Sequence, residues 1–412
     1  MAELARPECI PAGLPASLVY DFNPINNPEF AQDPWGMLAR VQNEAPSLFF
    51  STDSQTGQGH WYVQSEAAIR ELLQRHADFT TEMGITPGGA PWPRKIIPLE
   101  VDPPLHRDYR KILSPLFSPR AIDQRNQQIR ALVNDLIGRV EADGACEFLS
   151  AFAKPLPSTV LVDLMGLPED RRAEFVAWVE ELFHAPDRDQ QRAAGVRCMD
   201  YLNTVIDMRY AAPGDDAISE ICQATVDGEP LPREVVEDTV MFIFQAGLDT
   251  VTAGLAHCFA YLAQHPEHQD ELIADPSRIE NAVEEILRAF SWIGVTRRAR
   301  HDTQLLGTPI RAGDWVTTVP FGAGRDPELH DQPHVIDFHR ADVPHFAFGG
   351  GVHRCAGSHL ARKELYLAVE IWLQRIGRFA LKPGTSVEYL ASSMFQPKQL
   401  DLVWGPKVER GS

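Results

Sequence analysis

An apolar segment over residues 233–264 constrains the fold of this 412-residue chain more than any other feature. Apolar side chains surround the helix that this segment predicts, most densely in the stretches VMFIF and GLAHCFAYL. Such a helix lies buried in the core of a large domain. No stretch of the sequence approaches the roughly 20 apolar residues that a membrane span needs. We therefore predict a long central helix in a large helical domain.

The middle of this helix carries the polar sequence AGLDT, from Ala246 to Thr250. Glycine destabilises a helix interior by about 1 kcal/mol relative to alanine, and a buried aspartate is costly unless it is paired. A threonine hydroxyl bonds back to the preceding turn and bends the helix. The segment predicts either a tight packing point with a satisfied polar pair or a functional groove.

The decapeptide FGGGVHRCAG, from Phe348 to Gly357, places Cys355 in a glycine-rich turn before a helical pattern. Backbone N–H groups can approach a sulfur in such a turn, and the helix presents the positive end of its dipole. Both effects favour the thiolate, which is the form of cysteine that binds a metal. A buried apolar cysteine needs none of the flanking residues, and zinc-type Cys-x-x-Cys spacing is absent.

This decapeptide resembles the cysteine-ligand loop of the cytochrome P450 family, the haem-thiolate monooxygenases. The residues that fall on the family pattern are Phe348, Gly349, Gly351, Cys355 and Gly357. The resemblance implies haem b (iron protoporphyrin IX) as cofactor, with Cys355 as the ligand of the haem iron and O2 as co-substrate. Thiolate donation favours splitting of the O–O bond.

The AGLDT segment resembles the oxygen groove of the same family. The resemblance implies that small residues such as Ala246 leave room for dioxygen beside the cofactor. Thr250 then holds the distal oxygen and a water, and Asp249 relays protons from solvent. These two residues are the predicted catalytic pair.

The resemblance extends along the chain and reaches the camphor hydroxylase group of bacterial P450s. It is carried by LVYDFNP, GHW, the DPP element, GLPED, PGDDAIS, PEHQDELI and LVWGP. It implies a mainly α fold with small β-sheets, in which the haem lies between a long central helix and the Cys-ligand loop. We expect one domain over residues 1–412, with an irregular lead at 1–16.

Periodicity predicts helices and a few strands consistent with that fold. The expected helices are 65–76, 120–142, 158–165, 169–183, 190–211, 233–264, 276–290 and 357–376. Asp275 and Pro276 form an N-cap and first helical residue, and Gly377 ends the last helix. Strands are expected at HWYVQS, TPIRAGDWVTTVPF and QLDLVWG.

Composition fits a soluble globular protein, with 44% hydrophobic and 23% charged residues. The net charge of -19 disfavours general nucleic-acid binding and binding to an anionic membrane. Six cysteines without paired spacing indicate a reducing cytoplasm. The N-terminal sequence has no basic region followed by a long apolar run, so we expect no signal peptide.

Two further sets of residues follow from the family resemblance. Glu285 and Arg288 lie three residues apart on one helix face and, with Arg340, match a structural triad. Haem propionates need cationic or donor partners, and the matching motifs nominate His106, Arg110, Arg297 and His353. Each charge-assisted bond contributes about 1.5–3 kcal/mol.

Electrons have to come from a separate protein, because no G-x-G-x-x-G segment opens a helix after a strand. We expect a basic island on the cysteine side, formed by Arg107, Arg110, Arg354 and Arg362. An acidic [2Fe–2S] ferredoxin with an NAD(P)H-dependent reductase is the expected partner.

The pocket is expected to be compact and apolar, and the preferred substrate is an oxygenated monoterpenoid that is hydroxylated at a C–H bond. Gln245, one turn before the oxygen groove, could donate a hydrogen bond to a substrate oxygen. If Arg94 or Lys95 points inward, a small aromatic acid is oxidised or O-demethylated instead. The remaining expected wall residues are Phe183, Phe242, Ile293, Val295 and Met394.

Two other hypotheses about the function remain open. A haem-thiolate protein that uses peroxide directly has less need of the Asp249–Thr250 pair. A haem-binding sensor or carrier without turnover has no need of it and oxidises no NADH with any ferredoxin system.

Overall fold

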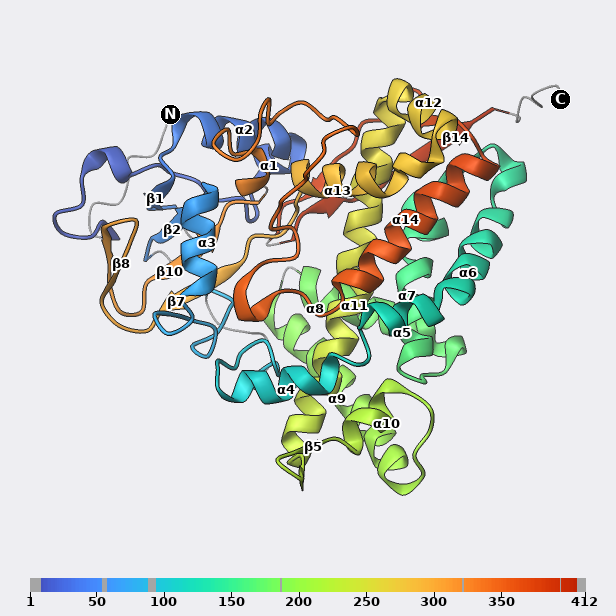
Figure 1. Ribbon diagram of the computed structural model, residues 1–412, viewed down its shortest axis with the longest axis horizontal. Helices are drawn as coiled ribbons and strands as arrows, with labels where there is room; N and C mark the ends of the chain where they lie inside the picture. The colour runs from blue at the N-terminus through green and yellow to red at the C-terminus, as the bar shows by residue number, and fades with distance from the viewer. Residues whose placement is uncertain are drawn as a thin grey trace.

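The computed structural model describes residues 9–53, 58–87, 94–185, 187–320, 322–392 and 394–405. Over these residues the chain is mainly helical, with several small β-sheets (Figure 1). The predicted fold class is therefore confirmed. Residues 1–8 of the expected irregular lead lie outside the described residues, and residues 10–15 hold no helix or strand.

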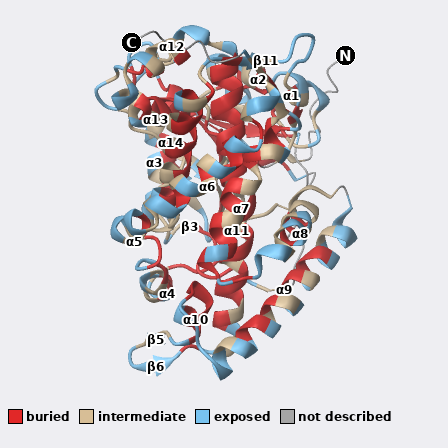
Figure 2. Cartoon of the chain, turned by 90° about the vertical axis from the view of Figure 1, so that its right-hand side faces the viewer, coloured by how far each residue is buried: buried red, intermediate tan, exposed pale blue. Residues whose placement is uncertain are grey.

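The central helix is α11 (Arg233–Gln264), which has the predicted bounds and runs through the molecule as a nearly continuous buried column (Figure 2). By length and composition it could cross a membrane, but most of it is buried inside the protein. It contacts α7 (Pro155–Leu164), α8 (Arg172–His184), α9 (Arg188–Ala211) and α14 (Ser358–Arg375). These neighbours explain why all its faces are apolar.

The remaining α-helices pack around this centre. They are α1 (Pro28–Gln32), α2 (Pro34–Glu44), α3 (Glu66–Gln74), α4 (Leu105–Leu113), α5 (Pro119–Gln124), α6 (Asn126–Gly138), α10 (Ala217–Cys222), α12 (Pro266–Ala274) and α13 (Ile279–Ala289). The helix expected over 120–142 is wrong as one element, because the chain breaks at Arg125 between α5 and α6. Sequence periodicity missed α1, α2, α4, α10 and α12, which are short.

The largest sheet has five strands in the order β1-β2-β10-β7-β3, and only its β10–β2 pair is parallel. Its strands are β1 (Leu48–Ser51), β2 (His60–Val63), β3 (Phe79–Thr80), β7 (Thr296–Ala299) and β10 (Trp315–Thr318). A three-stranded sheet joins β11 (Phe379–Leu381), β14 (Asp401–Trp404) and β4 (Ala145–Glu147). The expected strands near 60 and at the C-terminal end are present, whereas the stretch TPIRAGDWVTTVPF holds two strands in different sheets, β9 (Thr308–Ile310) and β10.

Three two-stranded ribbons complete the described strands. They pair β5 (Thr225–Val226) with β6 (Glu229–Pro230), β8 (Thr303–Leu305) with β9 (Thr308–Ile310), and β12 (Tyr389–Leu390) with β13 (Gln396–Pro397). The main apolar core surrounds α11, and a smaller core lies between the five-stranded sheet and α3. The chain segments that follow α13 and precede α14 connect these two cores.

Candidate active site

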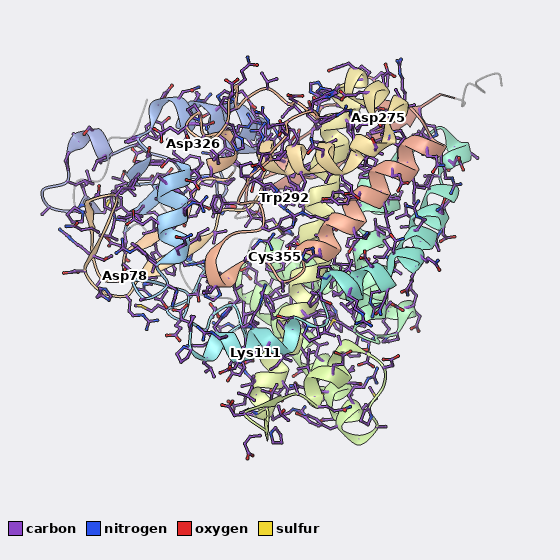
Figure 3. The ribbon with its side chains drawn as sticks, viewed as in Figure 1. Asp78, Lys111, Asp275, Trp292, Asp326 and Cys355 are labelled. Atoms are coloured by element: carbon purple, nitrogen blue, oxygen red, sulfur yellow. The ribbon has the colours of Figure 1, made fainter. Side chains whose placement is uncertain are left out.

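Cys355 lies near the centre of the molecule, close to the start of α14 (Figure 3). Its backbone N–H donates to the carbonyl oxygen of Phe348 at 2.9 Å, which closes the loop. Gly349 and Gly351 have left-handed φ values of 65° and 63°, which favour glycine. A Cβ atom at Gly351 would lie 2.1 Å from the carbonyl oxygen of Leu73. The glycine pattern is thus required by backbone geometry and by the close approach of α3.

The surroundings of the Cys355 sulfur contain groups that raise the pKa of its thiol and groups that lower it. Desolvation by the surrounding protein raises the pKa of the thiol, although the residue has exposed surface. The backbone N–H of Gly357 and the guanidinium groups of Arg110, Arg354 and Arg362 lower it. A metal ion would add the missing positive charge and stabilise the thiolate. The site is therefore suited to a cationic metal centre.

The four predicted propionate partners converge on one side of this loop. The rings of His106 and His353 lie 4.4 Å apart between centroids, and Arg110 donates to the carbonyl oxygen of Arg354 at 2.5 Å. Burial lowers the pKa of Arg297 to about 10, and its guanidinium donates to the carbonyl oxygen of Thr296 at 2.8 Å. Burial also lowers the pKa of His106 to about 4.

Asp102, which the sequence did not nominate, links this cluster to the five-stranded sheet. It accepts a hydrogen bond from His353 at 3.1 Å and pairs with Arg300 at 2.9 Å. Burial raises the pKa of this carboxyl, but the hydrogen bonds from His353 and Thr80 outweigh that effect and hold it well below its usual range. Because Asp102 stands in the DPP element beside His106, its position could have been a signal of such a role.

Two ion-pair networks are built on neighbouring residues of α13. Glu285 pairs with Arg288 at 2.6 Å, with both side chains fully buried, and with Arg340 at 3.3 Å. Arg288 also donates to the carbonyl oxygen of Pro333 at 2.8 Å. The three residues predicted as a structural triad are therefore brought together. Burial raises the pKa of Glu285, but the bond from Arg288 outweighs it, so the pKa is lowered.

Glu284, adjacent in sequence to Glu285, forms the second network and was missed. Arg362 pairs with it at 2.6 Å, Tyr366 donates to it at 2.6 Å, and His345 lies at 3.1 Å. The Arg362 guanidinium also lies over the ring of Phe348, 4.4 Å from its centroid. Arg362 is thereby fixed beside the cysteine loop, and its charge is balanced within the protein.

On the other side of the site, α11 runs unbroken through the AGLDT segment. The hydroxyl of Thr250 donates to the carbonyl oxygen of Ala246 at 2.9 Å. Phe242, Ala246 and Thr250 recur every fourth residue and keep partial exposure within this buried helix, so they form an accessible stripe. Gly247 has a different role, because a Cβ atom there would lie 2.9 Å from Leu161 of α7. The packing interpretation of the segment therefore holds at Gly247, and the groove at Ala246 and Thr250 stays a prediction.

Asp249 is buried and paired, as a buried carboxylate requires. Its Oδ2 atom lies 2.7 Å from Nε2 of His184, the last residue of α8. Its Oδ1 atom accepts a hydrogen bond from Nε2 of Gln396 in β13 at 3.2 Å. The sequence indicated that Asp249 needs a partner, but nothing in the pattern identified these two residues.

The expected wall residues lie in several elements. Ile293 and Met394 form an isolated antiparallel bridge. Phe183, at the end of α8, and Phe242 are partly buried against the main core, whereas Val295 packs against the smaller one. Gln245 is buried, and its Oε1 atom has no hydrogen-bond partner among the described residues.

Arg94 is bound to the first turns of α11. It pairs with Glu237 at 2.6 Å and with Asp238 at 2.9 Å, and it donates to the carbonyl oxygen of Glu234 at 2.9 Å. Burial raises the pKa of Asp238 to about 6, against the opposing effect of Arg94. Lys95 is exposed. Residues 88–93 of the preceding loop lie outside the described residues.

The arrangement fits a haem. A cysteine sulfur near three guanidinium groups can ligate the iron, and the buried Arg297 and His106 with His353 form a donor set for two carboxylates. The accessible stripe on α11 supplies apolar side chains, Phe242 and Ala246, and the hydroxyl of Thr250. This donor set is unlike a zinc site, which needs several thiolate or imidazole ligands around one point.

Comparison with known proteins agrees with this geometry. The family model for "Cytochrome P450" matches residues 48–399. A probable cytochrome P450 127A1 from Sinorhizobium fredii is 34% identical over 403 residues, covering 96% of this chain and 97% of the relative. The crystal structure of cytochrome P450 CYP101C1 has a TM-score of 0.86 at 30% identity and covers 96% of this chain and all of that one. That of CYP101J2 also has a TM-score of 0.86, at 26% identity, with the same coverage.

These matches confirm the resemblance to the camphor-like group of bacterial P450s. They also confirm that the activity is that of a monooxygenase with a cysteine-ligated haem and O2 as co-substrate. The individual roles of the site residues remain predictions. The chain belongs to the cytochrome P450 family.

Proposed function

We propose that the enzyme hydroxylates a C–H bond of an oxygenated monoterpenoid. The observation that carries this proposal is Gln245, a buried amide whose Oε1 atom lacks a partner among the described residues. It lies on α11 one turn before Asp249, next to the accessible stripe that contains Phe242 and Ala246. A buried polar group without a partner is costly. A ligand hydroxyl could donate to Oε1, and the Nε2 amide hydrogens of the same side chain can donate to a ketone or ether oxygen.

The expected wall residues and the pairing of Arg94 support a neutral substrate. Ile293, Met394, Phe183 and Phe242 are apolar, and the charge of Arg94 is balanced by Glu237 and Asp238. A substituted benzoate would need a cation that is free to pair with its carboxylate. The exposed Lys95 and the paired Arg94 do not offer one, so the terpenoid is the better supported class.

The haem would supply oxygen activation when bound, and the protein would supply its position. In this proposal Cys355 is the ligand of the iron, while His106, Arg110, Arg297 and His353 bind the propionates. Phe348 and Gly357 fix the loop. Ala246 leaves space beside the cofactor. The hydroxyl hydrogen of Thr250 is donated to the Ala246 carbonyl, which leaves the oxygen lone pairs of Thr250 able to accept a hydrogen bond from water.

We further propose that the electrons come from a [2Fe–2S] ferredoxin that an NAD(P)H-dependent reductase keeps reduced. Arg107 and Arg354 are exposed, and Arg110 hydrogen-bonds to the Arg354 backbone near Cys355. Arg362 contributes less to this surface because it pairs with Glu284. Reduction by ferredoxin should slow with rising salt, and more so in wild type than in an Arg107→Glu variant.

The proposed domain organisation, localisation and partners follow from membership of the same family. The chain works as one cytoplasmic domain, without nucleic-acid or membrane partners. The 233–264 segment, which alone among the described helices is long and apolar enough for a membrane, is mostly buried. This favours a soluble enzyme.

A spin-state titration of the ferric haem tests the substrate. Camphor and 1,8-cineole form one panel, and para-substituted benzoates form the other. A shift of the Soret band to the blue with the terpenoids alone supports the proposal, whereas a shift with the benzoates alone overturns it.

A Gln245→Leu variant sharpens the test. One lost hydrogen bond of about 1 kcal/mol should weaken camphor binding roughly fivefold. Binding of bornane, which lacks the ketone oxygen, should not weaken. Equal losses for the two ligands would show that the amide only fills space.

A further inference from the structure

Asp249 is held by two side chains of different chemistry. Nε2 of His184 lies 2.7 Å from its Oδ2 atom, and Nε2 of Gln396 lies 3.2 Å from its Oδ1 atom. The two partners also approach each other to 3.5 Å. The glutamine amide can hold the carboxylate but cannot give up a proton, whereas a histidine ring can do both near neutral pH.

His184 lies on the solvent side of this cluster. Its side chain is 16% exposed, compared with 6% for Asp249. It is the last residue of α8, and the helix ends there because Ala185 adopts an extended conformation. The ring therefore connects a buried carboxylate on α11 to the protein surface.

The other charged groups near this histidine are already paired or exposed. On α8, Glu180 pairs with Lys154 and Glu181 pairs with Arg197 of α9. At the start of α9, Asp187 caps the helix and Arg188 donates to the carbonyl oxygen of Pro87 at 3.5 Å. From α11 the group that faces the ring is Asp249. The carboxylate of Asp249 is thus the group within hydrogen-bond distance of the ring that can exchange a proton with it.

We propose that His184 is the proton entry point for Asp249. In the step, the Nε2–H bond of the imidazolium breaks and an O–H bond forms at Oδ2 of Asp249. No electrons are exchanged, and the neutral ring regains a proton from solvent. His184 is a positioning and relay residue that acts through Asp249. The proposal rests on the monooxygenase activity of the family, not on the identity of the substrate or the electron donor.

Three variants of the holoenzyme separate proton supply from simple positioning. His184→Gln keeps a hydrogen-bond donor but cannot relay a proton, and His184→Lys keeps a cation that does not titrate near neutral pH. His301→Gln is the matched control, because His301 and Asp78 form an exposed His–Asp pair at 2.9 Å. NADH-driven turnover of 1,8-cineole is measured between pH 5 and 8, with a plant-type [2Fe–2S] ferredoxin and its reductase as surrogate donors.

The wild type and His301→Gln should share one pH profile of the rate, and the His184 variants should depart from it. His184→Gln should be slower by roughly 10²-fold, the lower end of the contribution of a positioned proton donor. Both His184 variants should show a flat pH profile, and the solvent deuterium isotope effect should increase in His184→Gln. A pH profile of wild-type shape in either variant would overturn the proposal.

A second readout does not depend on turnover. In the reduced, carbon monoxide-bound and therefore diamagnetic protein, the Nε2–H proton of His184 should give a downfield NMR signal. The signal should vanish in His184→Gln and in Asp249→Asn and remain in His301→Gln. If no signal has this dependence, Nε2 carries no proton toward Asp249 and the proposal fails, whatever the surrogate ferredoxin does.

Discussion

The two sides of the active site are held in different ways. On the cysteine side, by which we mean the loop Phe348–Gly357 with the α13 and α14 residues around it, ion pairs such as Glu285–Arg288 and Glu284–Arg362 hold several charged groups. On the oxygen side, by which we mean α11 from Arg233 to Thr250 and its contacts, the polar groups are held less completely. Gln245 has an unsatisfied atom, and Asp249 depends on one histidine and one amide.

This difference separates two tasks. A metal ligand must stay in one geometry, and a buried network of carboxylates and guanidinium groups enforces that at the cost of desolvation. Oxygen, protons and substrate must instead reach a site that admits them. The oxygen side therefore keeps partly exposed residues on an otherwise buried helix.

The largest effect should come from breaking the buried pair on the cysteine side. Glu285→Gln leaves Arg288 as an uncompensated buried cation and should cost about 3–5 kcal/mol of unfolding free energy. Urea denaturation of the holoenzyme measures the loss. The matched control is Glu370→Gln in α14, whose pair with Arg130 at 2.8 Å is partly exposed and should contribute less than about 1 kcal/mol. Equal losses of unfolding free energy in the two variants would show that the buried pair stabilises the protein no more than the exposed one.

On the oxygen side, Thr250→Ala should change chemistry without changing stability greatly. Electron uptake continues, so NADH is consumed, but the product formed per NADH should fall by roughly 10²-fold, as for other positioned proton-transfer groups. Released hydrogen peroxide should account for the difference. Thr252→Ala, which removes bonds to the carbonyl oxygens of Ala153 and Leu248, is the control. Unchanged product yield in Thr250→Ala would remove this residue from the proposed pair.

Glu364 of α14 should give the cysteine side a pH-dependent stability. Burial raises the pKa of this carboxyl from its ordinary value of 4.5 to about 8. The folded protein therefore holds the proton more tightly than the unfolded chain. The resulting stabilisation is complete below pH 4.5 and is lost as the pH rises through 8. Between these values stability should fall by about 1.4 kcal/mol per pH unit. Denaturation at pH 6 and pH 8 should show this fall in wild type. Glu364→Gln should reduce it, and an unchanged slope would mean that Glu364 is ionised when buried.

The smallest effect should come from Arg94→Ala on the oxygen side. Its pairs with Glu237 and Asp238 are about one third exposed at the arginine, so their loss should cost less than about 1 kcal/mol. High salt should shrink the difference between variant and wild type because it screens the pairs. A loss of unfolding free energy as large as that of Glu285→Gln would show that ion pairs stabilise both sides equally.

The sequence predicted the cysteine side better than the oxygen side. The glycines around Cys355 and the Glu285–Arg288 spacing are local patterns with direct geometric consequences, and α11 has its expected bounds because its apolar character persists over the whole segment. The partners of Asp249 and Arg94 could not be predicted, since tertiary packing brings them from distant segments. The break at Arg125 was also missed, because apolar periodicity resumes in α6 after it.

The approach of Gly351 to the carbonyl oxygen of Leu73 has a consequence for folding. The turn before Cys355 is shaped against a helix that stands almost three hundred residues earlier in the chain. Contacts of such long sequence separation form late, because closing the intervening loop costs entropy. The ligand loop should therefore acquire its final shape only after the N-terminal part of the chain has docked. A C-terminal fragment that contains both α11 and Cys355 should for this reason bind haem poorly.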